Sequence, residues 1–165
     1  MNNNKNILIL NTGGTFNKVY NELNGKLTVP KDNSAIDKII KSIKIETITV
    51  KGLIYKDSLD INKQDRKELV SYINSLDYKK MIIIHGTDTM GKTASYLNKY
   101  IKNKQIVLTG AMIPFSIDSI EATANLMSAY GFILNCSKDD TYISMHGLIK
   151  KFNKIKKNRE IGVFQ

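Results

Sequence analysis

Short apolar runs alternate with segments of helical periodicity along the whole chain, and this alternation limits the possible folds more than any other feature. Apolar or β-branched runs predict strands over Ile7–Leu10, Ile45–Val50, Met81–His85, Ile106–Thr109 and Tyr142–Met145. Apolar residues at helical spacing predict helices over 34–43, 62–76, 90–101 and 120–134. Strands that alternate with helices pair in parallel, and the helices cover both faces of the sheet. The sequence therefore predicts an α/β domain with a parallel sheet.

Three polar loops that contain glycine follow three of the predicted strands, at residues 11–15, 85–89 and 109–116. In open parallel sheets, ligands bind beyond the carboxyl ends of the strands. Because all three loops lie at that edge, we expect them to meet and to form an active site.

The size and residue types of the chain limit its class. Its 165 residues, 42% of them apolar, suit a single domain over residues 1–165. The longest apolar run, Met81–Ile84, is too short to span a bilayer, and Met1–Lys5 lacks the pattern of a signal peptide, so we expect a cytoplasmic protein. Cys136 has no second cysteine to pair with, and no Cys/His cluster has zinc spacing. We expect no metal and no cofactor.

The chain is strongly basic, with a formal net charge of +10. A basic chain favours acidic partners, but its only arginines are Arg66 and Arg159, and specific readers of nucleic acid usually rely on arginine forks. This composition disfavours nucleic acid as a partner and leaves that alternative open. Six basic residues lie close together within 150–159, where a solvated tail is the simplest interpretation.

The loop Asn11–Thr15 contains two glycines after a strand, and Thr15 presents a hydroxyl that could act as a nucleophile. Its spacing matches neither of the common glycine-rich phosphate loops, and a purely structural turn is the alternative.

The segment His85–Met90 places hydroxyls and a carboxylate at a junction between strand and helix. Asp88 could bind an amine and Thr87 could act as a nucleophile or proton carrier, or Asp88 or Thr89 could simply cap the helix. His85 and His146 end apolar runs, and we assign neither a catalytic role.

Taken together, these motifs resemble those of the bacterial-type L-asparaginases, threonine amidohydrolases that cleave the side-chain amide of asparagine. The matching stretches, in chain order, are Thr12–Thr15 (TGGT), Asp57-Ser58-x-Asp60, His85–Met90 (HGTDTM), Gly110-Ala111-Met112-x-Pro114 and Asn125-Leu126. The resemblance covers essentially the whole chain. It implies a flavodoxin-like, three-layer α/β/α domain that hydrolyses L-asparagine or a related small amide without a cofactor.

The resemblance also implies roles for single residues. Thr15 matches the nucleophile, Thr87 the second hydroxyl, and Asp88 the carboxylate that holds the substrate α-amine. Ser58 matches the serine that holds the α-carboxylate. Gly86 and Ala111 lie in the matched motifs and are assigned to substrate binding.

The catalytic lysine and tyrosine are less sharply defined. Counting from the strand that ends at Met145 places the lysine at Lys157, with Lys156 as its adjacent rival. We expect Lys157 to contact Thr87 and Asp88. Leu27-Thr28-Val29 matches the stretch that carries the tyrosine of the mobile loop in other members. Tyr20 is our candidate for this tyrosine, because its context resembles the tRNA-amidotransferase branch of the family.

Some features depart from the family pattern. Leu59 follows Ser58, Glu121-Ala122 replaces Asp-Gly, and the chain stops at Gln165, so we expect no C-terminal domain and none of the glutamate that this domain contributes. These departures motivate an alternative, a catalytically silent module that binds an amino acid. A second alternative is an amidase subunit that acts on aminoacyl-tRNA, which the positive charge favours. Because family sites are completed across subunits, we also expect a homo-oligomer.

Overall fold

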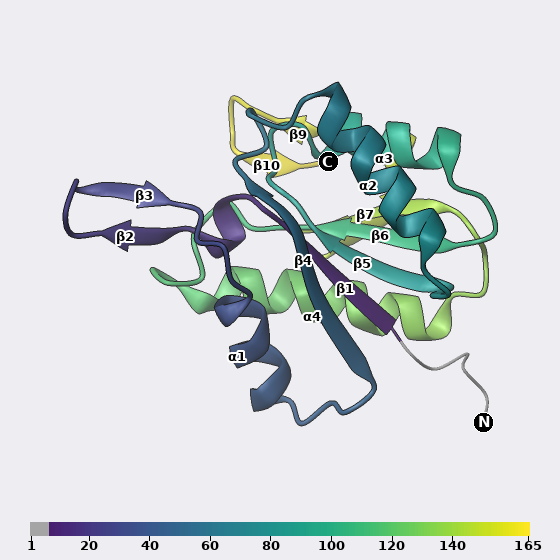
Figure 1. Cartoon of the computed structure of the whole chain (residues 1–165), viewed down its shortest axis with the longest axis horizontal. Helices are drawn as coiled ribbons and strands as arrows, with labels where there is room; N and C mark the ends of the chain where they lie inside the picture. Colours follow the sequence, from purple (N-terminus) through teal and green to yellow (C-terminus); the bar gives the residue numbers. More distant parts are fainter. Residues whose placement is uncertain (1–6) are drawn as a thin grey trace.

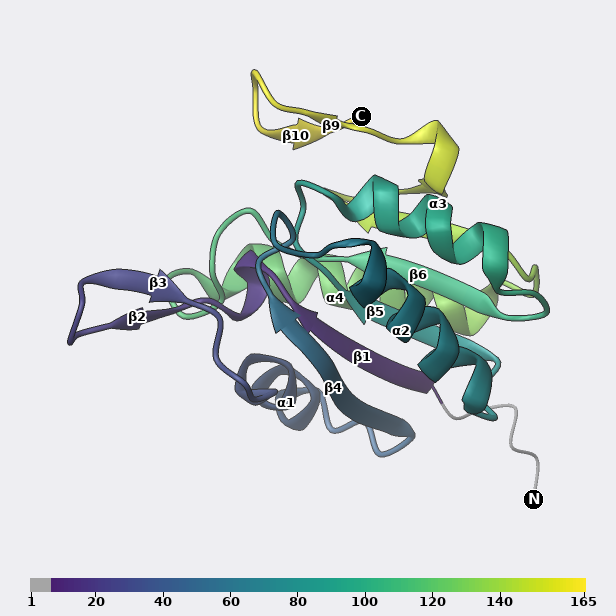
Figure 2. The ribbon, with the colours of Figure 1, turned by 45° about the horizontal axis from the view of Figure 1, so that its top comes forward.

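The computed structural model describes residues 7–165, so the expectation for Met1–Lys5 lies outside the described residues. The described residues form a six-stranded sheet of order β4-β1-β5-β6-β7-β8 between two layers of helices (Figures 1 and 2). Five strands pair in parallel and β8 pairs antiparallel to β7. The strands are β1 Ile7–Gly13, β4 Ile48–Lys56, β5 Lys80–Ile84, β6 Gln105–Thr109, β7 Thr141–Met145 and β8 Leu148–Lys151. The helices are α1 Ser34–Ser42, α2 Lys63–Ser75, α3 Met90–Tyr100 and α4 Ser119–Asn135.

The central strands are buried on both faces, which explains their continuous apolar runs. In β1, Leu8 and Leu10 pack in the same core cluster as α2 and α3, and Ile7 and Ile9 pack in the cluster of α1 and α4. All four side chains are fully buried. The two clusters confirm the predicted α/β/α layers.

The order of the parallel strands agrees with the flavodoxin-like expectation. Numbered along the chain, the strands β1, β4, β5, β6 and β7 take the order 2-1-3-4-5. The order reverses between β1 and β5, and a ligand is expected beyond the carboxyl ends of these two strands. The loops at residues 11–15 and 85–89 follow them.

One connection departs from the usual handedness of such sheets. The connections through α3 and α4 both step to the next strand in the same direction, yet α3 and α4 cover opposite faces (Figure 2). The crossover through α4 therefore has the opposite hand to the one through α3. Crossovers in parallel sheets are nearly always right-handed, so the chirality of this connection could not be expected from the sequence.

The predicted helices agree with the structure to within one or two residues at their ends. The Asn62 side chain caps α2, since its oxygen accepts bonds from the backbone of Gln64 and Asp65, and Asp65 accepts one from Asn62 in return. In the described residues no helix is long and apolar enough to cross a bilayer.

Several strand predictions need correction. The predicted strand 45–50 begins at Ile48 and runs on to Lys56, because this edge strand is half-buried throughout and includes polar residues. Strand β1 extends to Gly13, since Asn11 and Thr12 are buried rather than part of a solvent-facing loop. Strand β8 and two hairpins were not predicted; the hairpins are β2 Val19–Asn21 with β3 Lys26–Thr28, and β9 Lys157–Asn158 with β10 Val163–Phe164. The first hairpin projects from the body of the domain, and the second lies beside α3 (Figures 1 and 2).

Candidate active site

Three loops are in contact where the strand order reverses. Thr12 Oγ1 donates a 2.7 Å hydrogen bond to the carbonyl of Ile84, which joins the end of β1 to the end of β5. Gly14 packs directly on the backbone of Gly86. A Cβ atom on Gly86 would lie 2.6 Å from Cβ of Ser58, so the loop after β4 meets the same point. The predicted convergence of the loops at residues 11–15 and 85–89 is present, and the loop that contains Ser58 joins them.

Ser58 is held by its main chain. Its side chain is buried, and its carbonyl accepts a 2.7 Å bond from Thr89 Oγ1. Thr89 occupies the N-cap position of α3, but its side chain makes no capping bond. Side-chain capping by Asp88 or Thr89, the alternative considered for this segment, is therefore wrong. The hydroxyl of Thr89 joins the loop after β4 to the helix instead.

Thr87, Asp88 and Lys157 form the centre of the candidate site. Lys157 Nζ lies 2.9 Å from Thr87 Oγ1 and 2.9 Å from Asp88 Oδ1. The Lys157 side chain is 14% exposed and that of Asp88 32%. The predicted contact between residues 70 positions apart in the sequence is thus present, and the solvated-tail interpretation is wrong for Lys157.

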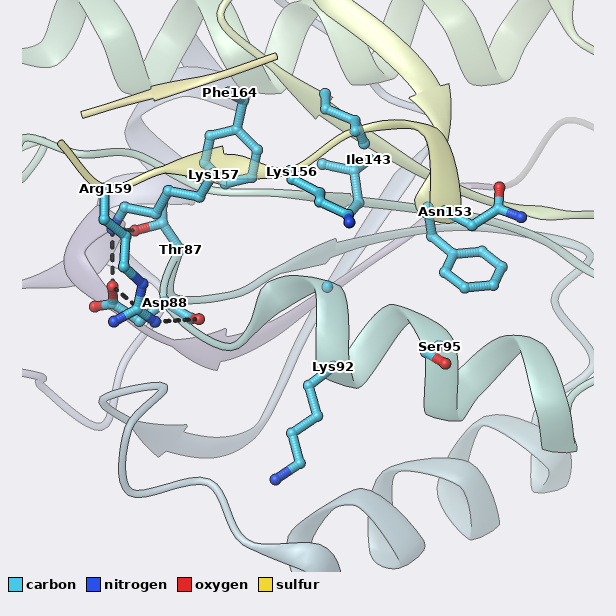
Figure 3. Close-up of a pocket in the computed structure, with 13 residues that line it drawn as sticks. Thr87, Asp88, Lys92, Ser95, Ile143, Asn153, Lys156, Lys157, Arg159 and Phe164 are labelled. Carbon is cyan, nitrogen blue, oxygen red and sulfur yellow. Dashed lines mark hydrogen bonds and ion pairs between the residues drawn. The ribbon is translucent and has the colours of Figure 1, made fainter. Parts of the chain in front are cut away.

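The neighbouring basic residues behave differently. Arg159 Nη2 donates to the Asp88 carbonyl at 3.2 Å and lies 3.9 Å from Asp88 Oδ1. Lys156 is exposed and its side chain points away from Asp88 (Figure 3). The geometry therefore favours Lys157 over its rival.

The β9–β10 hairpin presents Lys157 to the site. Lys156 and Gln165 exchange two backbone hydrogen bonds of 2.8 and 2.9 Å, and Lys157 lies opposite Phe164 in the next register position. A cavity of about 340 Å³ lies between this hairpin and α3, with Thr87, Asp88 and Lys157 among its lining residues (Figure 3). The cavity therefore adjoins the Thr87–Lys157 contact.

Thr15 begins a short turn of 3-10 helix, Thr15–Asn17, and is half-buried. The turn is fixed by two buried asparagines. Asn17 Nδ2 donates to Asn11 Oδ1 and to the carbonyl of Gly13, both at 2.9 Å, and the N–H of Gly13 donates to Asn11 Oδ1 at 2.9 Å. No role was predicted for these asparagines from the sequence.

Ala111 is buried in the loop after β6, and this loop reaches the turn that contains Thr15. The N–H of Phe115 donates a 3.2 Å bond to the carbonyl of Phe16, and Ser116 Oγ donates a 2.7 Å bond to the carbonyl of Lys18. The structure therefore brings the loops of Ala111 and Thr15 together.

Tyr20 is not brought into this cluster. It lies in β2 on the projecting hairpin, its side chain is 62% exposed, and Leu27 lies opposite it on β3. At the base of the hairpin, Lys18 Nζ forms a 2.6 Å ion pair with Asp57, the residue before Ser58. This ion pair connects the hairpin to the candidate site.

Two ionisable groups near the site are strongly affected by their surroundings. Burial lowers the pKa of His85 to about 4, and the ring therefore stays neutral; its Nδ1 lies 2.8 Å from the Gly86 carbonyl. Burial acts to raise the pKa of Asp57, but hydrogen bonds from Lys18 and the backbone of Leu59 hold it below its ordinary value. Over residues 7–165, no three His, Cys, Asp or Glu side chains are grouped to hold a metal ion.

No sequence pattern identified Arg159 as a partner of Asp88. Arg159 lies just beyond β9, in the turn of a hairpin that was not predicted, so no local spacing reports this contact. The Lys18–Asp57 pair left no signal either, since its partners lie on segments that only the tertiary fold brings together.

The chain is similar to known proteins of one family. Residues 6–163 match the family described as Asparaginase, N-terminal. An L-asparaginase of Thermococcus kodakarensis is 30% identical over 130 residues, which cover 76% of this chain and 40% of that protein. A glutamyl-tRNA(Gln) amidotransferase subunit of the same organism is 30% identical over 148 residues, covering 86% of this chain and 33% of that protein.

A solved structure agrees in fold. The probable cytoplasmic L-asparaginase of Campylobacter jejuni superimposes with a TM-score of 0.80 at 26% identity, over 97% of this chain and 52% of that one. Of the two relatives matched by sequence, the chain covers 40% and 33%, so it spans less than half the length of these curated relatives.

Proposed function

The chain belongs to the asparaginase family, because residues 6–163 match the family's N-terminal domain. We propose that it hydrolyses the side-chain amide of L-asparagine or a related small amide. The observation that carries the proposal is the pair of 2.9 Å contacts from Lys157 Nζ to Thr87 Oγ1 and Asp88 Oδ1. A lysine, a hydroxyl and a carboxylate in contact can move a proton to or from a reacting group.

The proposed reaction has two halves. The hydroxyl of Thr15 loses its proton as its oxygen adds to the amide carbon, the carbon–nitrogen bond breaks, and the nitrogen takes up that proton and leaves as ammonia. Water then cleaves the Thr15 ester, which releases the carboxylic acid and restores the hydroxyl. Lys157 and Thr87 exchange the proton across their 2.9 Å contact, and Asp88 keeps the lysine in place.

Substrate binding is assigned to the loops around these groups. Asp88 carries the negative charge that would attract the substrate α-amine, and Ser58 supplies a hydroxyl for the α-carboxylate. The N–H groups of the loops containing Gly86 and Ala111 are candidate donors to the carbonyl oxygen as it gains charge. Tyr20 belongs to this proposal only if the projecting hairpin closes over the site, since its side chain is 62% exposed.

We also propose that the protein is a homo-oligomer and that it is cytoplasmic. A homo-oligomer agrees with the apolar side chains that remain exposed near the site, among them Leu59 and Ile161. A cytoplasmic location is supported by the likeness to the probable cytoplasmic L-asparaginase of Campylobacter jejuni. Light scattering of the purified protein and fractionation of cells would test these two proposals.

The decisive experiment measures ammonia release from asparagine, with glutamine as a second substrate and aspartate as the blank. Thr15→Ala should fold and release no ammonia, while Thr15→Ser keeps a hydroxyl and should retain measurable turnover. Equal activity in Thr15→Ala and the wild type would contradict the proposed chemistry. Calorimetric binding of asparagine without turnover in the wild type would select a silent binding module instead.

A second candidate function is action on aminoacyl-tRNA. The match to the amidotransferase subunit covers 86% of this chain, and the formal net charge of +10 suits an acidic partner. If ammonia is released only when aminoacyl-tRNA is added, the result would favour this candidate. If release from asparagine is the same with and without aminoacyl-tRNA, the result would favour a small amide as the substrate.

A further inference from the structure

His146 connects three elements around the candidate site. It lies in the turn between β7 and β8, with a φ of 52°. Its backbone N–H donates to Asn125 Oδ1 at 3.0 Å, and its ring contacts Glu121 on one side and Phe164 on the other. No step of the proposed reaction uses this residue.

The contacts of the ring determine its tautomer. The N–H of Phe164 donates to Nδ1 at 3.3 Å, so that nitrogen must be an acceptor without a proton. The ring proton is therefore assigned to Nε2, which lies 3.1 Å from Glu121 Oε1. His146 thus donates to Glu121 while it accepts from Phe164.

Glu121 holds the loop that contains Ala111. Its Oε1 accepts a 2.9 Å bond from the N–H of Met112, and its Oε2 accepts a 2.9 Å bond from the N–H of Ile113. Both donors directly follow Ala111 in the chain. The Glu121 side chain is only 20% exposed, so water competes only partly for these bonds.

Phe164 holds the strand that pairs with Lys157. Because Lys156 and Gln165 already exchange their backbone bonds, the N–H of Phe164 points out of the hairpin, and it meets His146. The Phe164 side chain is buried, and its ring lies edge-on to the His146 ring with centroids 6.0 Å apart. His146 is therefore one of the attachments of the two-residue strand β10 to the body of the domain.

We infer that the Glu121–His146 pair is a positioning clasp, which fixes the β9–β10 hairpin and the Ala111 loop relative to each other. This inference rests on the proposed function, because it gives the clasp the task of holding Lys157 against Thr87 and Asp88. The clasp touches neither substrate nor reacting atoms. It acts through the backbone of Phe164 on one side and of Met112 and Ile113 on the other.

The test replaces His146 by Asn, a residue that tolerates the positive φ of this turn. His146→Asn should increase hydrogen exchange at the Phe164 amide and lower kcat by roughly 10- to 100-fold, because a small displacement of a reacting group is costly. KM should change much less, since Asp88 and Ser58 remain. Glu160→Gln is the control, because it removes an exposed carboxylate from the same hairpin.

A conservative variant separates positioning from general stability. Glu121→Gln keeps one oxygen to accept from the Ala111 loop and should recover part of the kcat that Glu121→Ala loses. If His146→Asn does not fold, this pair of variants takes over the test. The clasp would be overturned if the variant left both kcat and hydrogen exchange at the Phe164 amide unchanged. It would also be overturned if the variant lowered the free energy of unfolding while kcat stayed normal. The exchange measurement needs no turnover, so it still tests the clasp if the proposed amide hydrolysis fails.

Discussion

Gly14 packs so closely on Gly86 that a Cβ atom at position 14 would lie 2.4 Å from the Gly86 amide nitrogen. Gly14 also has a φ of 79°, which disfavours every side chain. The Gly86 atoms that this Cβ would meet belong to the backbone, so they cannot rotate away. The turn that presents Thr15 therefore depends on glycine at this position.

Gly14→Ala should accordingly lower the free energy of unfolding by roughly 1–3 kcal/mol and shift the turn that contains Thr15. Gly131→Ala is the matched control, because nothing lies within 4 Å of its added Cβ, and in helix α4 it should raise stability by up to about 1 kcal/mol. Urea unfolding and ammonia release would be measured on both variants. Equal stabilities would show that the loops can move apart.

Lys157 and Lys154 allow a comparison of two lysines from the same basic segment. Lys157→Met removes the partner of Thr87 and Asp88, so ammonia release should fall by roughly 100-fold or more, while calorimetry should still detect bound asparagine. Lys154→Met removes the same charge from an exposed side chain and should leave turnover within about twofold of the wild type. Similar losses of ammonia release in both variants would show that the positive charge of the segment matters and not the contacts of Lys157.

The sequence predicted the interior of this domain well, because burial on both faces leaves a direct pattern. Ile82 and Ile84 pack on one side of the sheet while Met81 and Ile83 pack on the other, and such a strand must be apolar throughout. Lys157 could be located because the match to a known family fixes its distance from the strand ending at Met145. The resemblance to that family also implied its contact with Thr87.

The exposed parts could not be predicted in the same way. The hairpin of Tyr20 has short strands with mostly exposed residues, so its side chains do not alternate between apolar and polar. The role of His146 depends on Glu121 and Phe164, which lie 25 and 18 positions away, and no local pattern reports such pairs. The hand of the α4 crossover is likewise a property of the tertiary packing.

The Lys18–Asp57 ion pair should control the hairpin that contains Tyr20. Its two side chains are 22% and 28% exposed, and it is the ion pair at the base of the hairpin. Lys18→Met should speed proteolytic cleavage at the exposed tip near Leu23 and lower ammonia release by a few-fold if the hairpin closes over the site. Lys26→Met takes the same charge from the hairpin farther from Asp57 and serves as the control. Faster cleavage with normal turnover would remove Tyr20 from the proposed mechanism.

His85 should make the stability of the protein depend on pH. Burial lowers its folded-state pKa from 6.5 to about 4, so between these values the unfolded chain binds a proton that the folded chain excludes. The free energy of unfolding should therefore fall as the pH drops from 6.5 towards 4, by roughly 3 kcal/mol in total, and His85 should contribute no further change above pH 6.5. Urea unfolding of the wild type and His85→Gln at pH 7.5 and 4.5 measures this contribution, because the other titrating groups are common to both proteins. The variant should lose less stability at low pH than the wild type does, and an equal loss in the two proteins would show that His85 takes up its proton without unfolding.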